Sequence, residues 1–326
     1  MHNYSDILEK TKKSLEQFDA NQADLDSTEL AQMYSVVFKS GLLEITHLPK
    51  LKQEELKQQL FFMLCQISGS LAFLVVQNLA AFTIMDNNNF LKRDNYKQYS
   101  CGIAINHLRS PKDEVEAKRV DGGYVVSGEL RWVSGDTIFE KLIVGFCFCG
   151  SEMEAIVDFK NSDSFKIDKA ELTVAGYAMM TQTISLKEYF VPNDTIISSH
   201  PRGNYTKAKS ASKTVHFCLY ALAWRASTEL EDLQLKKSIQ NRLDELKSSF
   251  MNSHDGYTLD NLRIELFSYA LDVAKLALTL SGGRALLLSS PIQRVYREIL
   301  MFNANGLNKN LKDLFLKKFN LDNQIA

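Results

Sequence analysis

The chain has 326 residues, of which 45% are hydrophobic and 24% charged, and its formal net charge is −1. This length and apolar content predict a large core, arranged in two or three packing units rather than one. The near-neutral charge gives no general attraction to nucleic acid or to an anionic membrane, and five prolines with fifteen glycines argue against disorder.

Five scattered cysteines indicate reduced thiols and a cytoplasmic location. Cys147 and Cys149 are separated by one residue, which is typical of strand alternation and not of a zinc site, so we expect no metal. The first 21 residues are polar and charged, without a signal peptide. The apolar stretch 71–85 is interrupted by two polar residues and is too short to span a bilayer, so we expect no membrane insertion.

Residues 1–95 predict an N-terminal helical domain. Ser27 or Thr28 is a natural N-cap, and the stretch after Ser70 is apolar on most faces, as in a helix buried between others. The helices that the pattern locates cover residues 27–39, 53–67 and a segment from about residue 70 onward.

Residues 96–200 predict a central β domain. Short runs rich in β-branched and aromatic residues alternate with turn signals such as Asp121-Gly122-Gly123. Strands at this spacing predict a small sandwich or barrel.

Residues 201–326 predict a C-terminal helical bundle, with 199–212 as a polar and basic linker. A long apolar stripe over 262–280 ends at a pair of glycines. Ser290-Pro291-Ile292-Gln293 has the pattern of a capping box with proline at the first helical position. In a last amphipathic helix, the residues expected to face inward are Leu311, Leu314, Phe315 and Phe319.

The most distinctive stretch runs from Gly122 to Gly135. In a regular strand Trp132 and Ser134 are two residues apart and face the same side. Such a pair would cover a planar heteroaromatic ligand and form a hydrogen bond with it. Packing of the indole in an ordinary sheet core is the alternative.

Several segments, in this order along the chain, resemble the acyl-CoA dehydrogenase family. The segment 121–134 is similar to the family's Trp-containing signature, and 176–192 resembles the segment that closes its β domain. Ser281-Gly282-Gly283, followed by 291–298, resembles its Gly-Gly loop and the arginine-rich helix after it. The resemblance implies an α+β fold of N-terminal helices, a central β-sandwich or barrel and a C-terminal helical bundle. The Trp-x-Ser-Gly ending also resembles the flavin monooxygenase branch of this fold.

The resemblance implies FAD as the cofactor. Trp132 would lie against the isoalloxazine ring, and Ser134 would form a hydrogen bond near its N5/O4 edge. Gly282 and Gly283 would approach the FAD of a neighbouring subunit, which implies a homodimer or homotetramer. A plain helix C-cap and turn is the alternative for the two glycines.

The chain departs from the family in its binding segments. The segment that lies along flavin and substrate is shorter here and contains His107 and Arg109, which are candidates for the substrate pocket or, alternatively, simply solvated. The segment that begins the family's adenine contacts is missing, and Thr279 replaces the glutamine before the glycine pair. These changes predict that the adenosine end of FAD is held weakly or differently.

The catalytic carboxylate of the family is also absent. Asn305 stands near the usual glutamate position, and asparagine has no useful basicity. The alternative position, within 213–226, offers no Asp or Glu, although it holds His216, which is either a proton acceptor or an ordinary packed histidine. Glu298 is expected to make a structural ion pair.

The sequence therefore favours an FAD-dependent oxidoreductase of acyl-CoA dehydrogenase type. It would oxidise a CH–CH bond of an acyl thioester or a similar small substrate. Two alternatives stay open: a flavin-dependent monooxygenase of the same fold, and a catalytically inactive binding or assembly member that keeps the scaffold.

Overall fold

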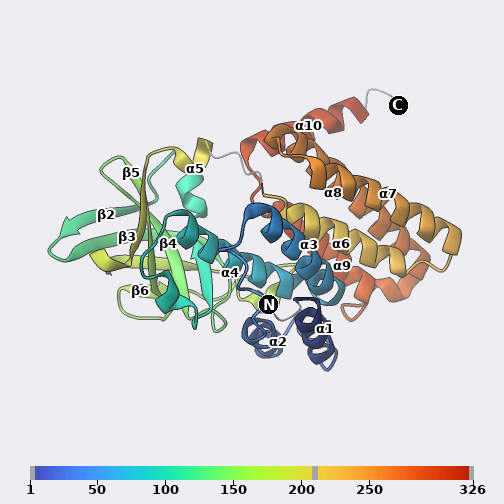
Figure 1. The fold of residues 1–326 in the computed structure, drawn as a ribbon, viewed down its shortest axis with the longest axis horizontal. Helices are drawn as coiled ribbons and strands as arrows, with labels where there is room; N and C mark the ends of the chain where they lie inside the picture. The colour runs from blue at the N-terminus through green and yellow to red at the C-terminus, as the bar shows by residue number, and fades with distance from the viewer. Residues whose placement is uncertain (1–3, 208–211, 323–326) are drawn as a thin grey trace.

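The computed structural model describes residues 4–207 and 212–322 of the chain. In Figure 1 the strands lie on the left and the C-terminal helices on the right, with α3 and α4 between them. The helix–strand–helix order confirms the predicted α+β class. Residues 208–211, within the expected linker, lie outside the described part of the chain.

The N-terminal part is helical, as expected. The N-cap of α2 is Asp26, not Ser27 or Thr28, because the Asp26 carboxylate accepts hydrogen bonds from the backbone N–H groups of Thr28 and Glu29. The four helices are α1 (Tyr4–Leu15), α2 (Ser27–Lys39), α3 (Lys50–Ile67) and α4 (Gly69–Asn87).

Helix α4 is the central helix of the fold. It packs on α2, α3 and α6 and on the first strand. Contrary to the expectation for residues 71–85, α4 is, among the described residues, the one helix long and apolar enough to cross a membrane by length and composition. Most of this apolar stretch packs inside the fold, since 61% of it is buried.

The eight described strands form one hydrogen-bonded sheet with two halves. Its order is β6-β7-β3-β2-β4-β5-β8, and β1 also pairs with β4. A single residue pair, Glu116 with Cys147, connects β2 to β4 and so joins the halves. The strands are β1 (Cys101–Ala104), β2 (Val115–Val120), β3 (Gly123–Val133), β4 (Lys141–Phe148), β5 (Ser151–Asp158), β6 (Phe165–Ile167), β7 (Gln182–Pro192) and β8 (Ile196–Pro201).

Aromatic side chains pack one half of the sheet against the other, as in a small sandwich. The ring of Tyr124 on β3 lies 5.7 Å from that of Phe146 and 5.1 Å from that of Phe148, both on β4. Phe165 on β6 contacts Phe159, just after β5, with ring centroids 6.3 Å apart. These distances are typical of edge-to-face aromatic pairs.

The C-terminal part is helical again. The box predicted at Ser290 does not form: Pro291 opens α9 as expected, but the Ser290 side chain makes no capping bond, and Gln293 Oε1 accepts from Arg297 Nε instead. Leu311 is buried as predicted, whereas Phe319 is exposed. The helices are α5 (Asn204–Lys207), α6 (Thr214–Thr228), α7 (Leu233–Asn252), α8 (Gly256–Ser281), α9 (Pro291–Ala304) and α10 (Lys309–Asp322).

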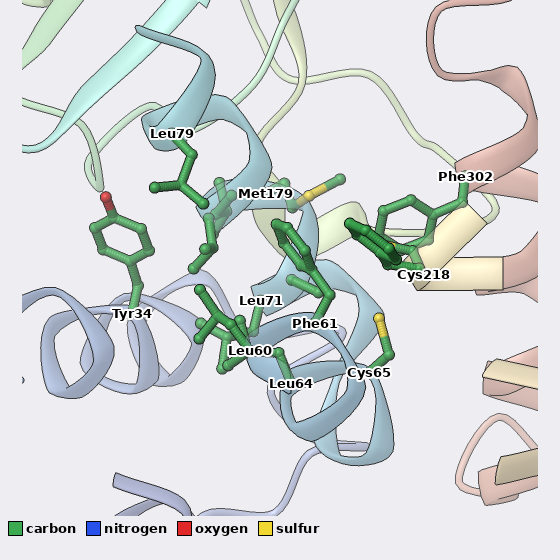
Figure 2. Close-up of a cluster of buried hydrophobic side chains, with 14 of the residues drawn as sticks. Tyr34, Leu60, Phe61, Leu64, Cys65, Leu71, Leu79, Met179, Cys218 and Phe302 are labelled. Atoms are coloured by element: carbon green, nitrogen blue, oxygen red, sulfur yellow. The ribbon is translucent and has the colours of Figure 1, made fainter. Parts of the chain in front are cut away.

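A continuous apolar core connects the helical parts. Figure 2 shows Phe61 and Leu64 of α3 with Leu71 of α4, near Cys218 of α6 and Phe302 of α9. All five side chains are fully buried. The core of the N-terminal helices is therefore continuous with that of the C-terminal bundle.

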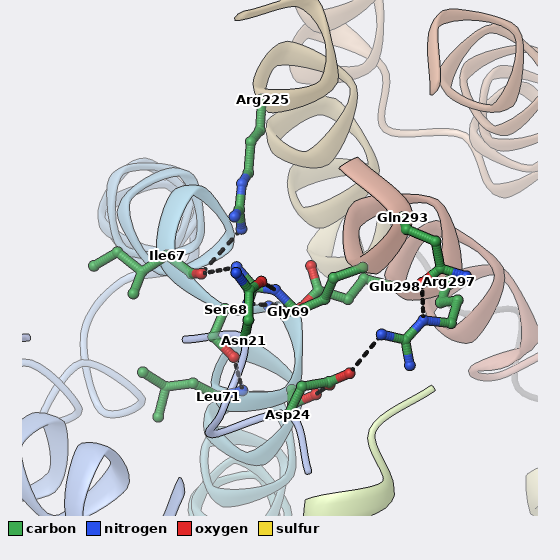
Figure 3. Close-up of polar contacts among 12 residues, drawn as sticks. Asn21, Asp24, Ile67, Ser68, Gly69, Leu71, Arg225, Gln293, Arg297 and Glu298 are labelled. Carbon is green, nitrogen blue, oxygen red and sulfur yellow. Dashed lines mark hydrogen bonds and ion pairs between the residues drawn. The ribbon is translucent and has the colours of Figure 1, made fainter. Parts of the chain in front are cut away.

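A buried polar network ties the same helices together where α3 ends and α4 begins (Figure 3). Glu298 of α9 accepts a hydrogen bond from the backbone N–H of Gly69 at 2.8 Å. Arg294 donates to Glu298 at 3.3 Å and to the carbonyl oxygen of Ile67 at 2.9 Å, and Arg225 of α6 also donates to Ile67. Burial raises the pKa of Glu298, and the two arginines act against this rise.

Gly69 is required by the close approach of Glu298. A Cβ atom at position 69 would lie 2.7 to 2.9 Å from three carbon atoms of the Glu298 side chain. We predict that Gly69→Ala destabilises the fold by about 1–3 kcal/mol through overpacking, measured by urea unfolding. Gly283→Ala is the matched control, because no atom of the described residues other than its two chain neighbours lies within 4 Å of its Cβ position. Equal unfolding free energies for the two variants would contradict the prediction.

Candidate functional site

A cavity of about 610 Å³ lies where α4, β1 and the C-terminal helices meet. Helices α3, α4, α6 and α8, strand β1 and the segment before α10 all contribute to its wall. This size suits a small molecule, and elements from all three parts of the chain close it. Its apolar lining includes Phe61, Leu79, Ile103, Ile105 and Leu311.

His216 of α6 lies in the cavity wall and is 3% exposed. Its Nε2 lies 2.8 Å from the carbonyl oxygen of Leu259. Because a carbonyl oxygen only accepts, Nε2 carries the proton, and Nδ1 of the neutral ring keeps its lone pair. Among the described residues Nδ1 has no hydrogen-bond partner. Burial lowers the pKa of His216 to about 4, so the ring is neutral near pH 7.

Arg263 of α8 holds the segment in which Asn305 stands. Its Nη2 donates to the carbonyl oxygens of Asn303 at 2.6 Å and of Asn305 at 2.7 Å, just where α9 ends. Burial lowers the pKa of this guanidinium to about 10. Arg263 and Asn305 both line the cavity, so the position near the family's glutamate does face this space, with an amide in place of a carboxylate.

Arg263 was not among the predicted site residues, although its place in the sequence is unusual. Arg263 occupies the same face of α8 as Leu259, Leu266 and Ala270, and all four are buried. An arginine within an apolar helical stripe is unusual unless the charge has partners.

Tyr205 of α5 contributes another part of the wall, and two buried carboxylates hold it. Its hydroxyl donates to Glu154, and its backbone N–H donates to Glu152. Arg202 also donates to Glu152, at 3.0 Å. Burial raises the pKa of the Tyr205 phenol, and the nearby Glu154 adds to the rise, so the phenol stays protonated. Sequence reading gave no indication of this group, whose members are brought together by the pairing of β5 with β8.

Trp132 and Ser134 do not face the same side, contrary to the expectation from strand alternation. The pairing of β3 with β7 is irregular after Leu130, and Trp132 has a left-handed φ of 61°. This bulge turns the indole outward, so that Trp132 is 66% exposed while Ser134 is 5% exposed. Neither residue belongs to the cavity wall.

The hydroxyl of Ser134 forms a pair with that of Thr181, with the two oxygen atoms 2.7 Å apart. Either hydroxyl can be the donor, and one bond uses one of the two protons. The second proton therefore remains available for an acceptor other than the described side chains. The exposed indole and the hydroxyl pair are thus separated by the bulge, although Trp132 and Ser134 are only two residues apart in the sequence.

Gly282 and Gly283 lie at the exposed end of α8. The cavity is lined by Arg263 near the other end of that helix. At 1.5 Å per residue the two points are roughly 28 Å apart along the helix axis. Within one chain the glycine pair therefore does not reach a ligand in this cavity.

The remaining predicted residues divide between the cavity and the scaffold. Arg109 lines the cavity, whereas His107 lies outside its wall, with Nε2 2.9 Å from the carbonyl oxygen of Gly145. Thr279 donates from its hydroxyl to the Lys275 carbonyl within α8. Glu298 is part of the buried network, as expected of a structural ion pair.

No protein-family model matches the sequence, and no relative is found among curated proteins by sequence comparison. Solved structures, in contrast, match nearly the whole chain. A chain of the electron transferring flavoprotein of Acidaminococcus fermentans gives a TM-score of 0.76 at 12% identity, covering 98% of both chains. Butyryl-CoA dehydrogenase from Megasphaera elsdenii gives 0.75 at 11% identity, also covering 98% of both. 3-HSA hydroxylase from Rhodococcus sp. RHA1 gives 0.68 at 12% identity, covering 95% of this chain and 94% of that one.

Likeness at such low identity shows the fold: the chain has the acyl-CoA dehydrogenase fold from end to end. The fold class that the sequence motifs implied is thereby confirmed. The same fold also occurs in the hydroxylase, so the fold by itself does not select one reaction.

The depressed pKa of His216 makes fold stability depend on pH. Between its ordinary value of 6.5 and the folded value of about 4, the unfolded chain binds more protons than the folded one. The stabilisation is therefore complete above pH 6.5 and is lost as the pH falls through 4. We predict that the wild type loses about 3 kcal/mol more than His216→Gln between pH 7 and pH 3.5, measured by urea unfolding at each pH. Parallel pH curves for the two proteins would contradict this.

Proposed function

From the acyl-CoA dehydrogenase fold, we propose that the chain is an FAD-dependent oxidoreductase that acts on an acyl thioester or a similar small substrate. The observation that carries the proposal is the cavity of about 610 Å³, which lies where the three parts of the fold meet. Its wall combines apolar side chains with Arg109, His216 and Arg263, so it offers both a place for an acyl group and polar groups to orient it.

Bound FAD would supply the chemistry of hydride acceptance. The residue that would hold it is Trp132, whose exposed indole offers a flat apolar face, whereas the buried hydroxyl of Ser134 is paired with Thr181. As the resemblance implies, Gly282 and Gly283 at the end of α8 would approach the FAD of a second protomer. Open space around both glycines permits such an approach.

His216 is the proton acceptor that we favour. Its Nε2–H is fixed by the Leu259 carbonyl, so any proton is taken up at Nδ1. A pKa of about 4 makes it a weak base, which suits a substrate whose C–H bond is already acidic. Asn305 would serve as a hydrogen-bonding group only.

A flavin-dependent monooxygenase is the second candidate. Among the described residues that line the cavity, Asp260 is the only carboxylate, and its Oδ2 is occupied by Asn310 Nδ2 at 2.7 Å. A reaction that needs no carboxylate base fits this lining, and the hydroxylase of the same fold supports it. The third candidate, an inactive binding or assembly member, is supported by the same missing carboxylate.

We also propose that the chain is cytoplasmic and forms a homodimer or homotetramer. Four leucines around the glycine pair are 58% to 83% exposed, and adjacent exposed leucines are typical of surfaces that another chain covers. They are Leu280, Leu286, Leu287 and Leu288.

The visible spectrum of the purified protein tests cofactor binding. We predict flavin absorption, either as purified or after incubation with FAD. Trp132→Ala is expected to weaken FAD binding roughly tenfold through loss of the aromatic contact, measured by fluorescence titration. Tyr257→Ala, which removes another exposed aromatic ring, is the control.

The same samples separate the candidates. Anaerobic bleaching of the flavin by butyryl-CoA, taken as a probe, supports the oxidoreductase. Oxygen consumption by the reduced flavin that depends on a second substrate supports the monooxygenase. A protein that takes up no FAD would exclude both and leave the inactive member.

Charged residues introduced among the exposed leucines near the glycine pair test the assembly. We predict that the double variant Leu286→Arg, Leu287→Arg shifts the protein to a monomer in sedimentation velocity, because a desolvated arginine pair opposes burial. Because the glycine pair would contact the FAD of a second protomer, the affinity for FAD should also fall when the protein becomes a monomer. Arg284→Leu, which adds no charge to the same loop, is the control. A wild type that is monomeric at all concentrations would contradict the proposed assembly.

A further inference from the structure

The wall of the cavity has an excess of positive charge. Its described lining contains four cationic side chains and one carboxylate, that of Asp260. The cations come from four separate elements, namely α3, η2 (Asn106–Arg109), α8 and the start of α10. They are Lys57, Arg109, Arg263 and Lys309.

Arg263 has a hydrogen-bond donor to spare. Its Nη2 is used by two backbone carbonyls, whereas Nε is buried without a hydrogen-bond partner within the described residues. The residue is only 6% exposed. Leaving a charged donor buried and unpaired is costly, and an anion in the adjoining cavity would offset part of that cost through its charge.

Lys57 is a further cation of the wall, and it is half-buried. Burial lowers its pKa, because its charged form loses part of its water. The carboxylate whose charge acts on Lys57 is that of Glu54, which already forms an ion pair with Lys213 at 2.8 Å. Arg109 donates to the neutral amide oxygen of Asn106.

Much of the remaining wall is apolar. Phe61, Leu79, Ile103 and Leu311 come from α3, α4, β1 and α10, and they give the cavity a hydrophobic side. A ligand that suits the whole wall therefore carries both an oxyanion and a short apolar body.

We propose that the cavity binds an amphiphilic anion, with a carboxylate or phosphate head held by cationic side chains of the wall, Arg263 and Lys57 among them, and a short apolar body against the apolar side chains. This inference names the substrate class, and it rests on the proposed function only in taking the cavity as the substrate site. The anionic head orients the ligand, because a cationic wall binds that end alone.

Probes that share one tail and differ in their head test the proposal. Binding of hexanoate, hexyl phosphate, hexan-1-ol and hexylammonium to the full chain is measured by calorimetry at constant ionic strength. We expect the better of the two anions to bind at least about tenfold more tightly than hexan-1-ol, and hexylammonium to bind more weakly than hexan-1-ol. The preference between hexanoate and hexyl phosphate distinguishes a carboxylate from a phosphate ligand.

Two variants locate the head. Arg263→Gln is expected to bring the anion-to-alcohol ratio close to one, and Lys57→Gln to reduce it. Because Arg263 also holds the carbonyls of Asn303 and Asn305, Lys57→Gln keeps the test valid if Arg263→Gln does not fold. Arg242→Gln, an exposed arginine of α7 outside the cavity, should leave the ratio unchanged.

An alcohol that binds as tightly as both anions would overturn the proposal, and so would an anion preference that survives in both variants. The measurement is repeated with and without FAD. Failure to bind FAD would contradict the proposed function and leave the head preference standing. Loss of the head preference in a protein that binds FAD would contradict this inference alone.

Discussion

The buried contact between Glu298 and the start of α4 is the constraint on which the arrangement of helices depends. The carboxylate accepts from the Gly69 backbone, and Arg294 connects it to the end of α3 through Ile67. A carboxylate in this position requires charge partners, because an isolated buried charge would be prohibitively costly. Arg225 of α6 brings the second C-terminal helix to the same point. The network thus fixes α9 and α6 against the joint between α3 and α4.

The same helices also carry residues of the cavity wall. Phe61 lies on α3 before the joint, Leu79 lies on α4 after it, and His216 lies near the start of α6. With the helices held at the joint and packed through a continuous core, the wall is a rigid surface. Arg263 then ties the end of α9 to α8, so Asn305 is also held in place. The cavity is therefore built in advance of any ligand.

The sequence predicted the elements better than it predicted the site. Apolar periodicity located the helices, because burial of one face dominates their stability. The predicted orientation of Trp132 was wrong because a bulge, in which this residue has a left-handed backbone conformation, breaks the alternation of side chains. Nothing in the local sequence pattern predicts this bulge. Tyr205 and Glu154 were missed because they lie about fifty residues apart and meet only through strand pairing. Arg263 was recognisable as a charge on an apolar face, and its structural partners explain why that face tolerates it.

The absence of a carboxylate at position 305 is related to the charges of the other residues that line the cavity. Arg263 binds the backbone carbonyl of residue 305, so a carboxylate on that residue would be under the influence of its positive charge, which would lower the pKa of the carboxyl group and weaken it as a base. With an amide at that position, Asp260 is the one carboxylate among the described lining residues, and the lining keeps an excess of positive charge. The neutral His216 does not add to that charge, because burial keeps it unprotonated. We therefore propose that recognition of an anion and acceptance of a proton fall to different residues, the cations of the wall and His216.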